Sequence, residues 1–154
     1  MKVRDIMTPN PSFCREESTL ASAARLMWDG DFGALPVVDR DEKVIGVITD
    51  RDICMATWMR NEPESRVTVG DVVSGPVHRC RAEDDLPTPL AIMREAQVRR
   101  LPVVDKEGKL QGMLSVNDII LAAEDVPKAG RPTCKDVVAM LKAICEHRSL
   151  SASL

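Results

Sequence analysis

The stretch GVITDRDI, residues 46–53, ends an apolar β-rich run with a hydroxyl and places an aspartate three residues later, where helical polarity begins. A second stretch, GMLSVNDI, residues 112–119, follows the same plan of G-x-x-[ST]-x-x-D-I. The two stretches are 112 − 46 = 66 residues apart. They indicate a repeated junction at which a strand runs directly into a helix.

The offset of 66 extends over most of the chain without a gap. It maps LPVVD at 35–39 onto LPVVD at 101–105, and 17 of 54 positions are identical when residues 3–56 are compared with 69–122. This is an internal duplication. Because a solenoid needs about three or more repeats, two copies predict a pair that bury their faces on each other about a pseudo-twofold axis.

Each copy is predicted to have the order β-α-β-β-α, after an opening extended segment. The first helix is expected to begin after Ser18 or Thr19, as N-cap, and to end before Gly30. Its counterpart is expected to begin at Asp84 or Asp85. Two β-rich runs joined by a short polar turn then predict a hairpin, and the second helix follows it.

The repeats divide the chain into three regions of an α+β fold: a first repeat over 1–60, a second over 67–126, and a C-terminal region over 127–154. In the last region Thr133 is a candidate N-cap, and an apolar stripe predicts an amphipathic helix. The stripe consists of Val137, Met140, Leu141 and Ile144. It predicts packing on the same domain, with docking on a second subunit as the alternative, and the tail at 148–154 is expected to be loose.

The composition is typical of a globular protein and excludes some function classes. Of 154 residues, 44% are hydrophobic and 29% charged, and a net charge of −3 gives no electrostatic reason to expect nucleic acid as a partner. There is no apolar run near the roughly 20 residues of a membrane span and no signal-peptide stretch, so we expect no membrane partner and a cytoplasmic location. Five cysteines without a C-x-x-C pair predict neither a disulfide framework nor a zinc site.

The hydroxyl and aspartate of the junction have two interpretations. T-x-x-D is a capping box, and the pair that begins at Thr133 fits that role fully. In the repeats, however, the hydroxyl lies where a strand ends and a helix starts, where free N–H groups favour a phosphate. A carboxylate one turn inside can also accept hydrogen bonds from a ribose diol. Thr49 with Asp52, and Ser115 with Asp118, can therefore both cap a helix and hold a nucleotide.

A repeated unit with DIMTPNP at its opening, LPVVD before a hairpin and G-x-x-[ST]-x-x-D leading into a helix resembles the cystathionine-β-synthase (CBS) domain, here as a tandem pair or Bateman module. The resemblance covers about residues 1–124. It implies two units packed through their sheets, with a cleft on either side of the pseudo-twofold axis. It also implies binding of adenosine-containing ligands such as AMP, ADP, ATP or S-adenosylmethionine, and regulation rather than catalysis, with no cofactor and no metal.

The resemblance also implies which residues contact the ligand. Asp52 and Asp118 are expected to contact the ribose hydroxyls, and Thr49 and Ser115 the ribose–phosphate region. Val47 and Met113 are expected to contact the base. The cleft of Ser115 and Asp118 is expected to include Met7, Ser12, Phe32, Gly33 and Ala34. The cleft of Thr49 and Asp52 is expected to draw on Val73, His78 and Val98.

The two residues before LPVV distinguish the copies. Copy two has Arg99 and Arg100, where family members that sense adenylates carry basic residues, and copy one has Gly33 and Ala34. Two guanidiniums suit a phosphate because each donates a forked pair of hydrogen bonds, although adjacent arginines also serve as surface solubilisers. The asymmetry predicts that the clefts are not equivalent and leaves open that one is empty.

Three hypotheses for function follow. The first is a freestanding regulatory module that binds an adenine nucleotide and acts on an unknown regulated protein. The second is a protein-interaction scaffold of the same fold with vestigial clefts. The third is a minor enzyme or redox protein, and it ranks last because His78 and His147 lie beside no pattern that builds a known catalytic site.

A homodimer is also expected, because freestanding pairs that resemble this chain associate into flat dimers of four CBS units. The apolar helix residues that could form the interface are Leu26, Met27, Trp28, Met55, Trp58 and Met59. Met and Trp are enriched at interface cores, although the two tryptophans could equally be core residues.

Overall fold

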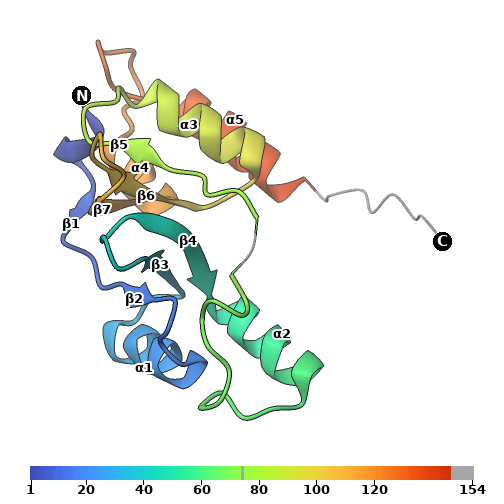
Figure 1. Cartoon of the computed structure of the whole chain (residues 1–154). Helices are drawn as coiled ribbons and strands as arrows, with labels where there is room; N and C mark the ends of the chain where they lie inside the picture. The colour runs from blue at the N-terminus through green and yellow to red at the C-terminus, as the bar shows by residue number, and fades with distance from the viewer. Residues whose placement is uncertain (74, 147–154) are drawn as a thin grey trace.

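The computed structural model describes residues 1–73 and 75–146 and consists of two halves, one above the other in Figure 1. The first half contains β2 (Cys14–Arg15), α1 (Leu20–Gly30), β3 (Ala34–Val38), β4 (Val44–Thr49) and α2 (Asp50–Arg60). The second contains β5 (Cys80–Arg81), α3 (Pro87–Ala96), β6 (Arg100–Val104), β7 (Leu110–Ser115) and α4 (Val116–Ala122). A 3-10 turn, η1 (Val3–Asp5), and β1 (Thr8–Pro9) precede them, and α5 (Cys134–Cys145) follows.

Each half has the predicted β-α-β-β-α order, and the α+β class is confirmed. The expected loose tail at 148–154 and His147 lie outside the described residues. Over residues 1–73 and 75–146, the structure has no helix with the length and apolar character needed to span a membrane.

The two sheets are related by a pseudo-twofold axis. β2 runs parallel to β3, which forms an antiparallel hairpin with β4, and β5, β6 and β7 repeat this arrangement. At the hairpin ends, the Val44 N–H donates to the Gly108 carbonyl (3.0 Å) and the Leu110 N–H donates to the Glu42 carbonyl (3.4 Å). The offset of 66 converts one bond into the other, which confirms the predicted relation between the copies.

The aspartate of LPVVD shapes both hairpin turns. The Oδ1 atom of Asp39 accepts from the Lys43 N–H at 2.9 Å, and that of Asp105 accepts from the Lys109 N–H at 2.8 Å. An aspartate that bonds to the backbone a few residues on is a typical turn device. Gly108 has a φ of 87°, as its place in the turn predicts.

The opening segments are exchanged between the halves, which the sequence did not reveal. The Val3 N–H donates to the Asp84 carbonyl (3.0 Å), and at the corresponding place the Val69 N–H donates to the Ser18 carbonyl (2.8 Å). Val3 is buried in the core of the second half, and Val69 is buried in the core of the first. Each core is therefore completed by the opening segment of the other repeat.

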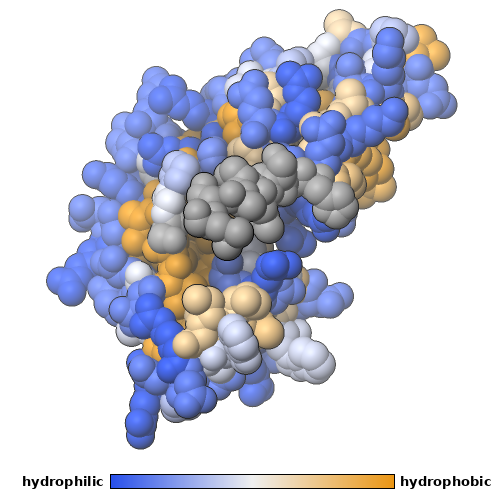
Figure 2. Space-filling model, turned by 90° about the vertical axis from the view of Figure 1, so that its right-hand side faces the viewer, coloured by the Kyte–Doolittle hydropathy of each residue, from blue (hydrophilic) through white to orange (hydrophobic). Residues whose placement is uncertain are grey.

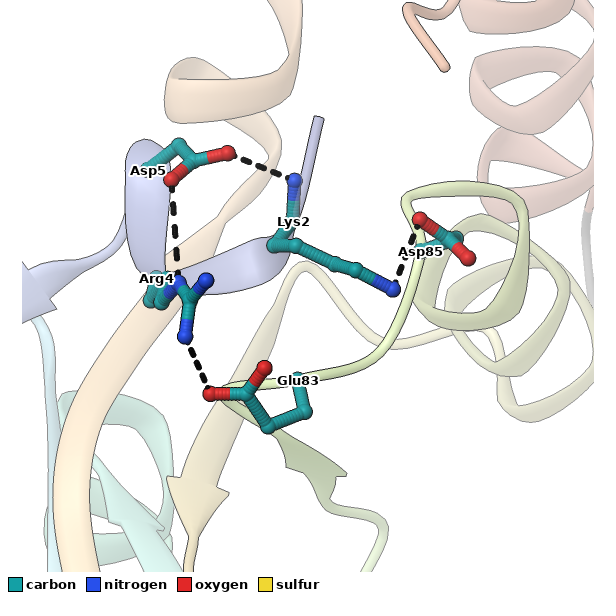
Figure 3. Close-up of polar contacts among 5 residues, drawn as sticks. All are labelled: Lys2, Arg4, Asp5, Glu83 and Asp85. Atoms are coloured by element: carbon teal, nitrogen blue, oxygen red, sulfur yellow. Dashed lines mark hydrogen bonds and ion pairs between the residues drawn. The ribbon is translucent and has the colours of Figure 1, made fainter.

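Figure 3 shows the polar contacts that accompany this exchange at the N-terminus. The Arg4 guanidinium lies 2.5 Å from a carboxylate oxygen of Glu83, and the Lys2 ammonium lies 3.1 Å from a carboxylate oxygen of Asp85. The Asp5 carboxylate accepts from the Lys2 backbone N–H at 2.7 Å. These side chains are exposed, so the ion pairs contribute little to stability, and the apolar burial of Val3 dominates.

The exchange explains the glycine of the repeated motif. A Cβ on Gly112 would lie 2.5 Å from the Met7 sulfur and 3.0 Å from the Thr8 carbonyl oxygen. A Cβ on Gly46 would overlap the side chain of Val73, which is the counterpart of Met7. Glycine is favoured at both positions because the exchanged segment crosses the strand there.

The helix α5 covers the helical face of the second half, next to α3 in Figure 1. It packs on α3 and α4, and Val137 and Met140 are buried in the same core as Met93 and Ile119. Its N-cap is Thr133, as predicted. The stripe packs on its own domain rather than requiring a second subunit.

Some predicted helix boundaries were wrong. Helix α3 begins at Pro87 with Leu86 as N-cap, not at Asp84 or Asp85, because proline is favoured in the first turn and Asp84 instead accepts from the Arg81 N–H.

Gly30 is the last residue of α1 rather than the residue after it, because Asp31 and not Gly30 takes the left-handed C-cap conformation. A Cβ on Gly30 would overlap the Phe32 ring, which accounts for glycine at this position. The opening segment is not a single extended run: η1 is helical, and β1 and β2 are short strands.

Candidate functional site

Both strand-to-helix junctions form the capping box. The Thr49 hydroxyl accepts from the Asp52 N–H (3.1 Å), while Oδ2 of Asp52 accepts from the Thr49 N–H (2.9 Å) and hydroxyl (2.7 Å). Ser115 and Asp118 repeat these bonds at 3.3, 2.7 and 2.6 Å. The capping interpretation therefore holds, and in each pair the capping bonds use the single oxygen Oδ2. The second carboxylate oxygen of each aspartate takes no part in these capping bonds. The first helical N–H groups already have partners, because the Asp50 N–H donates to the Gly33 carbonyl (3.1 Å) and the Val116 N–H to the Arg99 carbonyl (2.9 Å).

A hollow of about 530 Å³ lies beside Thr49, between the end of β4 and the chain that leads into β6. It gathers nine of the predicted site residues. They are Thr49, Val47, Val73, His78, Val98, Arg99, Arg100, Gly33 and Ala34. We call this space the Thr49 hollow.

The other predicted site residues lie elsewhere. Asp52, on the first turn of α2, is not among the residues that line the hollow, but its carboxylate is bonded to Thr49, which is. Gly33 and Ala34, expected beside Ser115, line the Thr49 hollow instead, and Phe32 lines a different hollow between α1 and α2.

Of the remaining five, Met113, Ser115 and Asp118 lie on β7 and α4 of the second half, Met7 packs against its core, and Ser12 lies between β1 and β2. β1 pairs with β7, with Thr8 opposite Met113, so the opening segment lies against the strand that would form the floor of the second cleft.

Residues that the sequence did not single out also line the Thr49 hollow. Arg51 and Asp50 come from the first turn of α2, and Gln97 precedes the arginine pair. Arg51 lies within the quoted motif, so its place at a helix N-terminus was a signal that could have been used. With Arg99 and Arg100 it brings three guanidiniums to the hollow against the single carboxylate of Asp50. The lining is net positive and suits an anionic ligand.

A sequence model of the CBS domain matches the chain twice, over residues 3–58 and 69–125. The chain belongs to the CBS domain family. It is 32% identical to hypoxic response protein 1 of Mycobacterium tuberculosis over 149 residues, which cover 97% of each chain.

Solved structures of similar proteins confirm the CBS pair fold. The crystal structure of hypoxic response protein I, with two coordinated zinc ions, has a TM-score of 0.73 and 31% identity, covering 82% of this chain and 100% of that one. CBSX2 in complex with AMP has a TM-score of 0.68 and 27% identity, covering 79% and 94%. The CBS pair of MJ0100, in complex with 5′-methylthioadenosine and S-adenosyl-L-methionine, shares the fold at 22% identity with a TM-score of 0.67, covering 79% and 94%.

A second hollow, of about 810 Å³, opens between α1 and α2 and is called the α1–α2 groove. Its floor includes Ala24, Met27 and Ile53, and Trp28 and Trp58 stand at its sides, 85% and 77% exposed. Figure 2 views the molecule from the α2 side and shows hydrophobic residues, in orange and pale orange, in the lower part where the first half lies.

The offset of 66 relates the α1–α2 groove to the seat of α5. Met27 and Ile53 correspond to Met93 and Ile119, which pack with α5 in the second half. The flanks differ, because Trp28 corresponds to Arg94 and Trp58 corresponds to Glu124. The same groove is thus filled by a helix in one half, and in the other it is open between two tryptophans.

The cysteines carry no arrangement suited to redox or metal chemistry in the described ranges. Burial raises the pKa of Cys14 to about 11 and that of Cys80 to about 12. Both are buried in equivalent strands and behave as apolar core residues. Over residues 1–73 and 75–146, no group of three His, Cys, Asp or Glu side chains is placed to hold a metal ion.

Proposed function

We propose that this CBS pair is a regulatory module that binds a phosphate-bearing adenosine ligand, AMP, ADP or ATP, in the Thr49 hollow. The observation that carries the proposal is the placement of Arg51, Arg99 and Arg100 around one hollow at a helix N-terminus. S-adenosylmethionine carries a sulfonium cation, so the same arginines disfavour it. The AMP complex of CBSX2 supports the ligand class.

Each side chain of the hollow has a proposed role. Thr49 and Asp52 bind the ribose and its phosphate, with the free carboxylate oxygen of Asp52 accepting from a ribose hydroxyl. The base packs between aliphatic side chains, which are Val47, Val73 and Val98. Arg99 and Arg100 bind the phosphates, and His78 lines the outer wall. Without an aromatic stack, we expect affinity in the micromolar range.

The second cleft is proposed to bind more weakly or to stay empty. The residues assigned to it by the family pattern are Ser115, Asp118, Met113, Met7, Ser12, Phe32, Gly33 and Ala34. Gly33 and Ala34, which are the counterparts of the arginine pair at the offset of 66, offer no cation to a phosphate and line the Thr49 hollow instead. A nucleotide there would rely on the Ser115 and Asp118 junction alone.

Binding regulates a partner only if the ligand has unequal affinity for two arrangements of the protein. We propose that the protein has no catalytic role of its own. Instead, it reports adenylate levels, and hence energy state, to a regulated protein. The scaffold hypothesis, in which the clefts are vestigial, makes the opposite prediction for ligand binding.

The test is isothermal titration of the full chain with AMP, ADP, ATP, S-adenosylmethionine and GTP. Asp52→Ala and Asp118→Ala are matched variants because each removes one capping carboxylate from an equivalent junction. We expect micromolar binding of an adenine nucleotide, lost in Asp52→Ala and kept in Asp118→Ala. Absence of heat with every ligand would favour the scaffold, and loss in Asp118→Ala alone would move the site to the second cleft.

The α1–α2 groove is proposed as the homodimer interface. The apolar residues on this face include Leu26, Met27, Trp28, Met55, Trp58 and Met59, and all but Met27 are exposed. A buried tryptophan removes roughly 150–250 Å² from water, so two per subunit supply a large part of the roughly 800 Å² per partner of a stable interface. The corresponding face of the second half is covered by α5, which supports pairing through the first half.

Sedimentation or light scattering of the full chain tests the dimer. Trp28→Ser with Trp58→Ser should give a monomer. Leu121→Ser is the matched control, because Leu121 is 86% exposed on α4 and lies away from the groove. A monomeric wild type, or dissociation caused by the Leu121 variant, would contradict the proposed interface.

A further inference from the structure

Gln97 connects the Thr49 hollow to helix α5. It is the C-cap of α3, in the left-handed region with φ 53° and ψ 42°. Its side-chain Nε2 donates to the Ala143 carbonyl at 2.9 Å and to the Glu146 carbonyl at 3.1 Å. Both partners are carbonyl acceptors, so the amide orientation follows from chemistry, with nitrogen toward α5.

The two carbonyls belong to the last turn of α5, which ends at Cys145 with Glu146 as C-cap. Carbonyls in the last turn of a helix have no intrahelical donor and need one from outside. Gln97 provides it from a different part of the chain. The amide therefore holds the C-terminal end of α5 in place, while the apolar contacts of Val137 and Met140 hold its middle.

The same residue lines the Thr49 hollow, and Val98, Arg99 and Arg100 follow it directly in the lining. A ligand whose phosphate binds the arginines therefore places strong acceptor oxygens near Gln97, within the reach that we infer for its side chain. The amide group has two N–H bonds, and α5 receives both. A phosphate or ribose oxygen that takes one of them must displace a bond to α5.

We propose that ligand binding in the Thr49 hollow and docking of the last turn of α5 are coupled through the Gln97 amide. This inference rests on the proposed function of the hollow. Ligand binding loosens the C-terminal turn of α5, and by thermodynamic reciprocity a loosened α5 raises ligand affinity by the same factor. The movable element is then a helix that covers an apolar groove, so a nucleotide changes the hydrophobic surface of the second half.

The chain provides a matched control for Gln97. Asp31 is its counterpart at the offset of 66, since 31 + 66 = 97. Asp31 is also a left-handed C-cap, of α1, with φ 53° and ψ 48°, and it lines the open α1–α2 groove instead of the Thr49 hollow. A change at Asp31 alters the same kind of helix end in a place where α5 is not seated.

The experiment combines hydrogen exchange over residues 134–146 with titration by AMP and ATP, on the full chain. Gln97→Asn tolerates the left-handed backbone, but its side chain is one methylene too short to reach the α5 carbonyls. Leu141→Ala loosens α5 from the apolar side without touching the hollow. Asp31→Asn is the control.

In the wild type we expect nucleotide to increase deuterium uptake in the last turn of α5. In Gln97→Asn uptake should be high without ligand and should not respond to it. Gln97→Asn and Leu141→Ala should bind AMP about fivefold more tightly, the size of one ordinary hydrogen bond. Asp31→Asn should match the wild type in both measurements.

The outcomes separate the two proposals. If no nucleotide binds the wild type, the proposed function fails and the coupling fails with it. If nucleotide binds but uptake in α5 is unchanged or falls, the coupling alone is overturned. If Asp31→Asn affects α5 and affinity as Gln97→Asn does, the effect comes from general loosening at a helix end, and the coupling is again overturned.

Discussion

In the first half, a hollow opens beside Thr49 and the groove between α1 and α2 is open to solvent. In the second half, α5 fills the groove between α3 and α4. Yet the halves share hairpin turns, capping boxes and exchanged backbone hydrogen bonds, related by one offset.

The comparison shows that the shared fold of the two halves and the different properties of their clefts and grooves depend on different sequence positions. The residues that build both cores are identical or nearly so, as in Leu20 and Leu86 or Leu35 and Leu101. The residues that set the halves apart are exposed or partly exposed in the later repeat, where Arg99 and Arg100 occupy the positions of Gly33 and the buried Ala34. Changes that leave the core intact were sufficient to give two clefts and two grooves different properties.

The largest expected effect concerns the two grooves, one covered by α5 and the other open. Met93→Ala should lower the free energy of unfolding by about 3 kcal/mol, because Met93 is fully buried beneath α5 and truncation leaves a cavity. Met27→Ala, at the matched position, should cost about 2 kcal/mol or less, because its outer side faces the open groove. Urea unfolding of both variants at low protein concentration is the measurement. Equal losses would show that α5 adds no burial at this position.

A second prediction sharpens the comparison of the clefts. Removing both guanidiniums, in the double variant Arg99→Ala and Arg100→Ala, should weaken AMP binding about 100-fold, since each charge-assisted contact contributes about tenfold. Titration calorimetry measures the change. Arg94→Ala is the control, because Arg94 lies on α3 outside the hollow. Unchanged affinity in the double variant would exclude the arginine pair as the phosphate site.

A third prediction concerns the motif glycines. Gly112→Ala should destabilise the fold by about 2 kcal/mol, because the new Cβ meets a backbone oxygen of Thr8 as well as Met7. Gly46→Ala should cost about 1 kcal/mol, because only the side chain of Val73 must move. Thermal unfolding should rank the two in this order. The reverse order would mean that β1 is held more loosely than its partner segment.

The smallest expected effect depends on pH. Hydrogen bonds from Thr68 and Thr133 hold the pKa of Asp71 and Asp136, respectively, below the ordinary carboxyl value. A lowered folded-state pKa stabilises the protein above the unfolded pKa of about 4, and this stabilisation is lost as pH falls below it. In the wild type, the docking of α5 should therefore weaken between pH 5 and 3, and in Thr133→Val this weakening should be smaller. Hydrogen exchange in α5 as a function of pH is the measurement. An unchanged pH profile would show that the capping box does not hold α5.

Local signals predicted most of the fold. The starts of α2, α4 and α5 followed from hydroxyl–aspartate pairs, and the hairpins followed from LPVVD and its turn. The start of α3 was missed because its N-cap is Leu86, whose apolar side chain is not a capping group that a sequence pattern could identify. The exchange of opening segments could not be foreseen, since the partners of Val3 and Val69 lie in the other repeat and no local periodicity marks them.

The site was predictable to the extent that it consists of motif positions. The hollow gathers residues from four separate stretches that the family pattern had named. Gln97 and Asp50 were missed because their roles arise only from the tertiary fold: one residue ends a helix, and the other lies where the Gly33 backbone approaches. No sequence spacing relates Gln97 to the carbonyl of Ala143, 46 residues away.

The exchanged opening segments have a consequence for how such a molecule comes together. With Val3 in one core and Val69 in the other, a chain carrying a single repeat could complete its core only by borrowing the segment of a second chain. Joining the repeats through residues 61–66 turns that encounter into an intramolecular step, with an effective concentration in the millimolar range. If this connection were cut, the two fragments would stay bound to one another, because each carries the valine that completes the core of the other.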